Sequence, residues 1–159
     1  MRSFTDAQGR TWLLAINVTT LKRVKALTGV DLLKLFDDGM KGLAEFVSDP
    51  VQLVDVLYAV CRDEALTRGV SDEDFGRAMH GDCIETAATA LLEELTDFFP
   101  DPRRRNIIRQ LLTTAMKASE EILNETAQKV SSLTPDQFRK LLNVQSTNVP
   151  GSSELTPAP

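Results

Sequence analysis

The chain has 159 residues, of which 42% are apolar and 26% are charged, as is usual for a soluble globular domain. Acidic side chains outnumber basic ones by 23 to 18, and the net charge of −5 argues against nucleic acid or an anionic membrane as a partner. No apolar run reaches the roughly 20 residues of a membrane-spanning helix, and the N-terminus lacks the apolar segment of a secretory signal, so we expect a cytoplasmic protein.

Residues 2–18 predict a β-hairpin. Apolar residues recur there with a period of two, typical of strands with one buried face, at Phe4, Trp12, Leu14 and Ile16. The segment "DAQG" between them supplies a turn. A lone hairpin is marginal in water, so its apolar face must pack on the rest of the chain or on a partner. Trp12 is therefore either an anchor in the core or an exposed contact for a partner.

Helical patterns follow the hairpin. Thr19 or Thr20 is a candidate N-cap for the first helix, and Gly29 is expected to end it. A short turn is predicted from Asp31 to Gly39, and a short helix is predicted in the segment "KGLAEFVSD". These two elements lead into the longer helices of the chain.

The strongest start signal for a helix is the run Asp49, Pro50 and Gln52, in which an N-cap is followed by proline and by a capping-box residue. The helix that begins there is apolar on most sides, which predicts a central place in the core. The segment "SDEDFGRAMHG" repeats the start signal with Ser71 as N-cap.

Two long apolar stripes follow, in residues 84–99 and 108–123, the second within a helix predicted over 103–130. We expect one stripe to pack inward and part of the other to remain available to a partner.

The fold class is thus mainly α: a small helical bundle with an N-terminal hairpin, in a domain over 1–130. Residues 131–159 read as a polar, disordered tail with a possible short helix at 135–143.

Catalytic and metal-binding patterns are weak. His80 is the only histidine, and a zinc site would have to join it to Cys61, Asp82 and Cys83 without the paired ligand spacing that zinc sites show. We expect a plain turn there, two free thiols, no metal and no cofactor. Adjacent glutamates point in different directions on a helix, so the sequence predicts no catalytic residue and no enzyme.

Arg103, Arg104 and Arg105 form an unusual cluster, because the start of a helix disfavours positive charge. One interpretation is a binding site for an acidic partner. The other is ion pairing with the acidic residues just upstream, which are Glu93, Glu94, Asp97 and Asp101.

The stretch "DAQGRTWLLAINVTTLKRVKALTGVDLLKL" resembles the beginning of the tail assembly chaperones of long-tailed (siphovirus-type) bacteriophages. Members of that family begin with a short strand pair, "GR-x-W-x-L", which leads to "I-x-V-x-x-L-K-R-V" and "G-V-D-L". The segments "DPVQLVDVLYAVC", "GVSDEDFGRAM" and "LLEELTDFFP" are also similar to the family. The resemblance covers about residues 2–105, and its motifs are structural rather than catalytic.

The resemblance implies a non-enzymatic protein of the host cytoplasm. Such chaperones bind the phage tape measure protein and keep it soluble while tail tube protein polymerises around it, and many also exist in a longer, frameshifted form. The family supplies no binding residues to transfer; Trp12 and the arginines at 103–105 are our own candidates. The hairpin would be either a clasp between the subunits of a homo-oligomer or the seat of the first helix. The alternative is a structural virion protein of the head–tail joint or tail.

Overall fold

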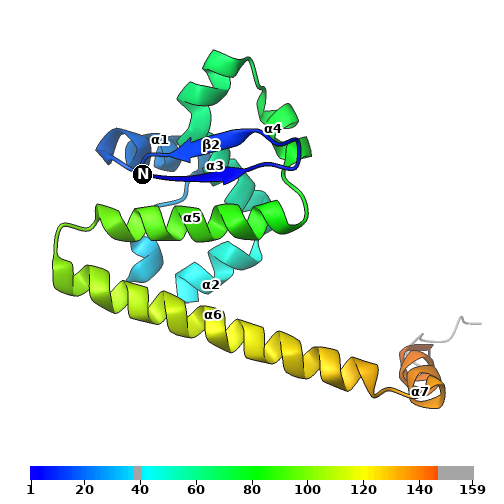
Figure 1. The fold of residues 1–159 in the computed structure, drawn as a ribbon. Helices are drawn as coiled ribbons and strands as arrows, with labels where there is room; N and C mark the ends of the chain where they lie inside the picture. The colour runs from blue at the N-terminus through cyan, green and yellow to red at the C-terminus, as the bar shows by residue number, and fades with distance from the viewer. Residues whose placement is uncertain (38–40, 147–159) are drawn as a thin grey trace, which may run out of the picture. The chain divides into compact units, whose positions relative to one another are not determined.

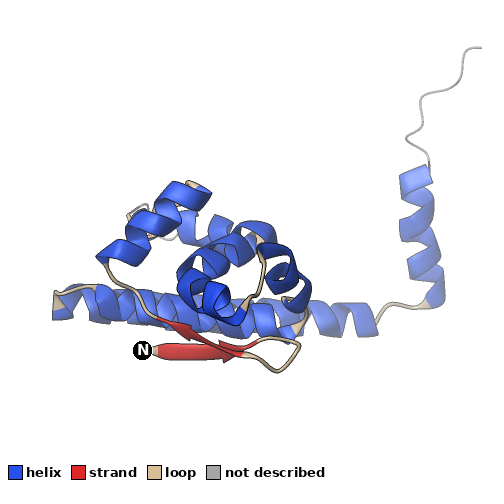
Figure 2. Cartoon of the chain, turned by 90° about the horizontal axis from the view of Figure 1, so that it is seen from above, coloured by secondary structure: helices blue, strands red, loops and turns tan. Residues whose placement is uncertain are grey.

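The computed structural model describes the backbone of residues 1–37 and 41–146 and the side chains of residues 1–37 and 41–140. The chain divides into two compact units, at residues 1–113 and 114–159. Its described part is mainly helical with one N-terminal hairpin, which confirms the predicted fold class (Figures 1 and 2). No helix in this part is long and apolar enough to cross a bilayer.

The hairpin consists of β1 (Arg2–Thr5) and β2 (Thr11–Leu14), which pair antiparallel with Phe4 opposite Trp12. The predicted turn is present: the Gly9 N–H donates to the Asp6 carbonyl at 2.9 Å, and Gly9 has a φ of 79°. The strands stop at Leu14 rather than continuing toward residue 18, because the chain turns there into the first helix.

That first helix, α1 (Val18–Thr28), begins two residues earlier than a cap at Thr19 allows and three residues earlier than a cap at Thr20 allows. Its N-cap is Asn17, whose side chain accepts a hydrogen bond from the Thr20 N–H at 2.9 Å. Thr20 lies inside the helix, where its buried hydroxyl donates to the Ala15 carbonyl at 3.1 Å. Gly29 ends α1 in the left-handed conformation, as predicted.

A short 3₁₀ helix, η1 (Lys34–Phe36), and the helix α2 (Lys41–Ser48) follow. The second of these matches the helix predicted in this segment. The predicted turn residue Gly39 lies outside the described residues.

Helix α3 (Pro50–Arg68) is the central element, because it contacts α1, α2, α4, α5 and β2. Asp49 caps it by accepting hydrogen bonds from the N–H groups of Val51 and Gln52, each at 3.1 Å. The reciprocal half of the predicted capping box is replaced, since the Asp49 N–H donates to the Phe46 carbonyl.

Helix α4 (Asp72–Ala78) starts at the predicted cap Ser71, and α5 (Asp82–Phe98) packs against α3 and against β1. Figure 1 shows the hairpin alongside α5, and Figure 2 shows both strands on one side of the helices. The main core joins the hairpin to α3, α4 and α5; a smaller cluster consists of Leu43, Phe99, Ile108 and Leu112.

Helix α6 (Pro102–Ser131) matches the prediction to within one residue at each end. Helix α7 (Pro135–Ser146) confirms the short helix in the expected tail but extends it beyond residue 143. The rest of the predicted disordered tail, 147–159, lies outside the described residues.

Candidate partner-binding surface

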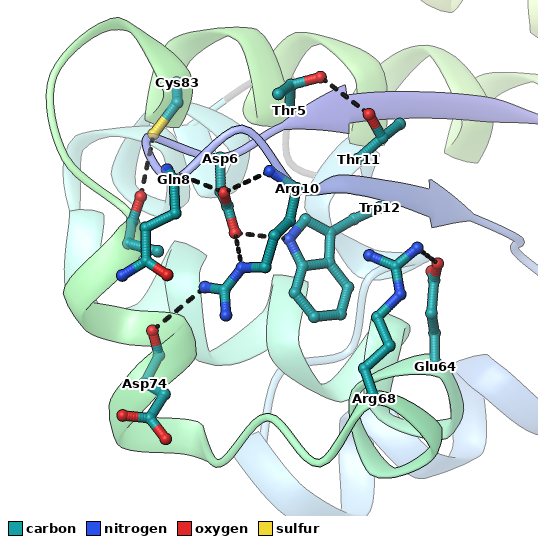
Figure 3. Close-up of polar contacts among 11 residues, drawn as sticks. Thr5, Asp6, Gln8, Arg10, Thr11, Trp12, Glu64, Arg68, Asp74 and Cys83 are labelled. Carbon is teal, nitrogen blue, oxygen red and sulfur yellow. Dashed lines mark hydrogen bonds and ion pairs between the residues drawn. The ribbon is translucent and has the colours of Figure 1, made fainter.

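Trp12 lies in the core, with 0% of its surface exposed. Its ring contacts Phe75 edge-on at a centroid distance of 5.0 Å. The Arg68 guanidinium lies 4.9 Å from the centroid of the Trp12 ring, and Figure 3 shows these two side chains. The interpretation of Trp12 as a hairpin anchor is therefore confirmed. Its candidacy as a partner contact is wrong for this conformation, because the alternation along β2 directs this side chain inward.

Beside Trp12 lies a buried carboxylate, Asp6, that the sequence identified only as a turn residue. One oxygen accepts the N–H groups of Gln8 at 3.0 Å and Arg10 at 2.9 Å. The other accepts the Trp12 indole N–H at 2.9 Å and the Arg10 Nε at 2.7 Å (Figure 3). Burial alone raises the pKa of Asp6, but the hydrogen bonds from Trp12 and Arg10 outweigh it and hold the pKa below its usual value.

The hairpin is fastened to α4 and α3 through backbone groups. The Ala7 N–H donates to the Ala78 carbonyl at 3.0 Å. On the outer edge of β2, the Leu13 N–H donates to the Glu64 carboxylate at 3.0 Å, and the Cys61 thiol donates to the Leu13 carbonyl. Because α3 occupies this edge at Leu13 and β1 contacts α5, the hairpin is mainly a seat for α3 and α5 rather than for α1.

The three candidate arginines have different surroundings. Arg105 donates to the carbonyls of Phe99 at 2.7 Å and Pro100 at 3.1 Å, and it therefore fixes the backbone that directly follows α5. Arg104 pairs with Asp37 at 3.4 Å and lies 4.5 Å from the Phe99 ring centroid. Arg103 is exposed, and its side chain makes no recorded polar contact within the described part of the chain.

The predicted pairing of these arginines with upstream carboxylates is wrong for their side chains. Glu93 pairs with Arg2 at 2.8 Å, Asp97 pairs with Arg2 and Arg109, and Glu94 lies 3.1 Å from the N-terminal amino group. The Asp101 carboxylate accepts the backbone N–H of Arg103 and pairs with none of the three arginine side chains. The cause lies in contacts between distant segments. Strand β1 places Arg2 and the N-terminal amino group beside α5, where they pair with these carboxylates.

The residues considered above as zinc ligands have other roles in the structure. Cys61 is buried in α3, and burial raises the pKa of its thiol to about 12. The Cys83 thiol donates to the His80 carbonyl at 3.0 Å. Both cysteines are free, and among the described residues no three His, Cys, Asp or Glu side chains are placed to hold a metal ion.

Exposed apolar surface is concentrated on α6. The inward stripe of α5 includes Leu91 and Leu95, which are fully buried. In the second unit, by contrast, large apolar side chains of α6 are 53% to 68% exposed. Met116, Leu123 and Val130 recur every seven residues on one side of the helix, and Ile122 lies at the edge of that side. We call this set the α6 stripe: Met116, Ile122, Leu123 and Val130. The predicted division between an inward and an available stripe is thus present.

Comparisons with protein-family models, with curated proteins and with solved structures found no match for this chain. The resemblance to tail assembly chaperones therefore stays a prediction.

Proposed function

We propose that this protein is a non-enzymatic tail assembly chaperone that binds a phage tape measure protein in the host cytoplasm and helps to recruit tail tube subunits. The observation that carries the proposal is the exposed α6 stripe, with support from the sequence resemblance in the first 105 residues. The binding surface in this proposal is the stripe itself rather than Trp12, which is buried.

The stripe suits a helical client. Long amphipathic helices aggregate through their apolar sides, and a second helix with apolar residues spaced by three and four can cover such a side. Each large apolar side chain that leaves water contributes about 1.5–3 kcal/mol before the cost of association is subtracted. For four such residues the sum is about 6–12 kcal/mol, which is of the same order as the cost of association and therefore favours weak, reversible binding.

Co-expression with the phage's tape measure protein tests the proposal. The chain should keep that protein soluble and co-purify with it. The double change Ile122→Glu and Leu123→Glu should abolish co-purification, because it charges the stripe while keeping residues that favour helix. Ile107→Glu is the matched control: Ile107 is 58% exposed on the same helix but lies in the first unit, outside the stripe.

Two results would contradict the proposal. One is a tape measure protein that stays insoluble while this chain is found in mature particles, which would favour a structural virion protein. The other is co-purification that survives the double change but is lost with Ile107→Glu, which would move the binding surface to the first unit.

A further inference from the structure

Helix α7 begins with a complete set of local start signals. The Thr134 N–H donates to the Gln137 side chain at 3.0 Å, and the Gln137 N–H donates back to the Thr134 hydroxyl at 3.4 Å. Leu133 and Phe138 occupy the positions on either side of this capping box that pack together in a hydrophobic staple. The start of α7 is therefore fixed by residues 133–138 alone.

These start signals do not make α7 stable in water by themselves. A helix of 12 residues is marginal without packing. Phe138 is 56% exposed, and the sequence places leucines three and four residues later, at 141 and 142. This spacing is that of an amphipathic helix, so α7 needs an apolar surface to cover it.

The α6 stripe is the apolar surface within reach. Only residues 132–134 separate the end of α6 from the start of α7, and such short connections join helices that lie antiparallel. The charges also agree: residues 114–131 of α6 carry three glutamates and two lysines, whereas α7 carries Asp136 against Arg139 and Lys140. The two helices thus have net charges of opposite sign.

We propose that α7 folds back along α6 as a helical hairpin and covers the part of the α6 stripe from Ile122 to Val130 when no partner is bound. In the antiparallel register, Phe138 lies level with Val130, and the last turn of α7 lies level with Ile122 and Leu123. If the stripe is also the client surface, which rests on the proposed function, a client has to displace α7. In this case α7 and the client compete for the same apolar surface of α6.

Hydrogen exchange of the full-length chain tests the fold-back without any client. Amides of α7 should exchange at least about tenfold more slowly than unprotected amides, because burying one phenylalanine supplies more than that factor. Val130→Gln and Phe138→Gln should each remove this protection while keeping helix propensity. The matched controls Ile107→Gln, on α6 but outside the stripe, and Arg139→Gln, on α7, should leave it intact.

Three results would overturn the inference. The first is unprotected exchange of α7 in the unchanged chain. The second is protection that disappears on dilution together with a dimer seen by mass measurement, which would mean that a second copy covers the stripe. The third is protection that survives both Val130→Gln and Phe138→Gln.

A binding measurement then separates this inference from the proposed function. Phe138→Gln should strengthen binding of the tape measure protein if the stripe is the client surface. If α7 is protected but no client binds, the fold-back stands and the proposed function is wrong. If a client binds at the stripe but α7 is unprotected, the proposed function stands and the fold-back is wrong.

Discussion

Asp6 accepts four hydrogen bonds with its two carboxylate oxygens, although its side chain is completely buried. A buried carboxylate is costly unless it is paired, and here the partners come from the turn, from Arg10 and from Trp12. The network fixes the rotamer of the tryptophan around which the hairpin packs. Asp6 therefore specifies the geometry of the hairpin as well as its stability.

Asp6→Asn should lower the free energy of unfolding by about 3 kcal/mol at neutral pH, because an amide nitrogen then faces one of the buried donors. The folded pKa of Asp6 lies below its unfolded value, so its stabilisation is present above about pH 4 and is lost as pH falls through the folded pKa. Urea denaturation of both proteins between pH 7 and pH 3 measures this. A stability difference that stays constant across the range would contradict it.

The arginine cluster should separate into a structural and a surface residue. Arg105→Ala should cost about 1–2 kcal/mol, because it leaves the carbonyls of Phe99 and Pro100 without their donor. Arg103→Ala should stay within about 0.5 kcal/mol, as is usual for an exposed side chain. Thermal denaturation of the two variants measures the contrast; equal losses would show that our assignment of Arg105 is wrong.

Among the helices, the ends that are set by local signals could be predicted from the sequence. Asp49, Ser71 and Gly29 act within one turn of their own position, so the sequence alone located those helix ends. The cap of α1 was misplaced by three residues or fewer, because Asn17 caps the helix while the Thr20 hydroxyl donates to the Ala15 carbonyl instead. The partners of Arg2 and the burial of Asp6 depend on contacts between distant segments, which no local pattern encodes.

Asn17→Ala should destabilise the protein by about 1 kcal/mol, because it removes the side-chain acceptor of the Thr20 N–H at the start of α1. Thr19→Ala should be neutral or slightly stabilising, since Thr19 is exposed inside the helix and alanine favours helix there. Chemical denaturation compares the two. A larger loss of stability for Thr19→Ala than for Asn17→Ala would show that Thr19 is the N-cap, as the sequence suggested.

At the scale of the whole molecule, the two units differ in how much apolar surface they bury. Both apolar clusters lie within residues 1–113, and every described side chain from 113 to 140 is exposed. The free energy of folding therefore comes mainly from the first unit. The sequence predicted this body well, and its possible short helix at 135–143 is present as part of α7.

A fragment of residues 1–113 should fold cooperatively, with a free energy of unfolding within about 1 kcal/mol of the full chain, because it keeps both clusters. Removing only residues 147–159 should leave the melting temperature unchanged, because this polar segment has little apolar surface to bury. Denaturation followed by circular dichroism measures both. An unfolded fragment would show that the second unit supports the first.

The contact between β1 and α5 has a consequence for synthesis. Ribosomes make the hairpin before α5, the helix on which β1 packs, and α5 ends only at Phe98. Until then the nascent chain carries Phe4 and Trp12 with their main apolar partners incomplete, and contacts between such distant segments form slowly. The hairpin therefore reaches its native environment only after α5, much later in the chain, has been translated.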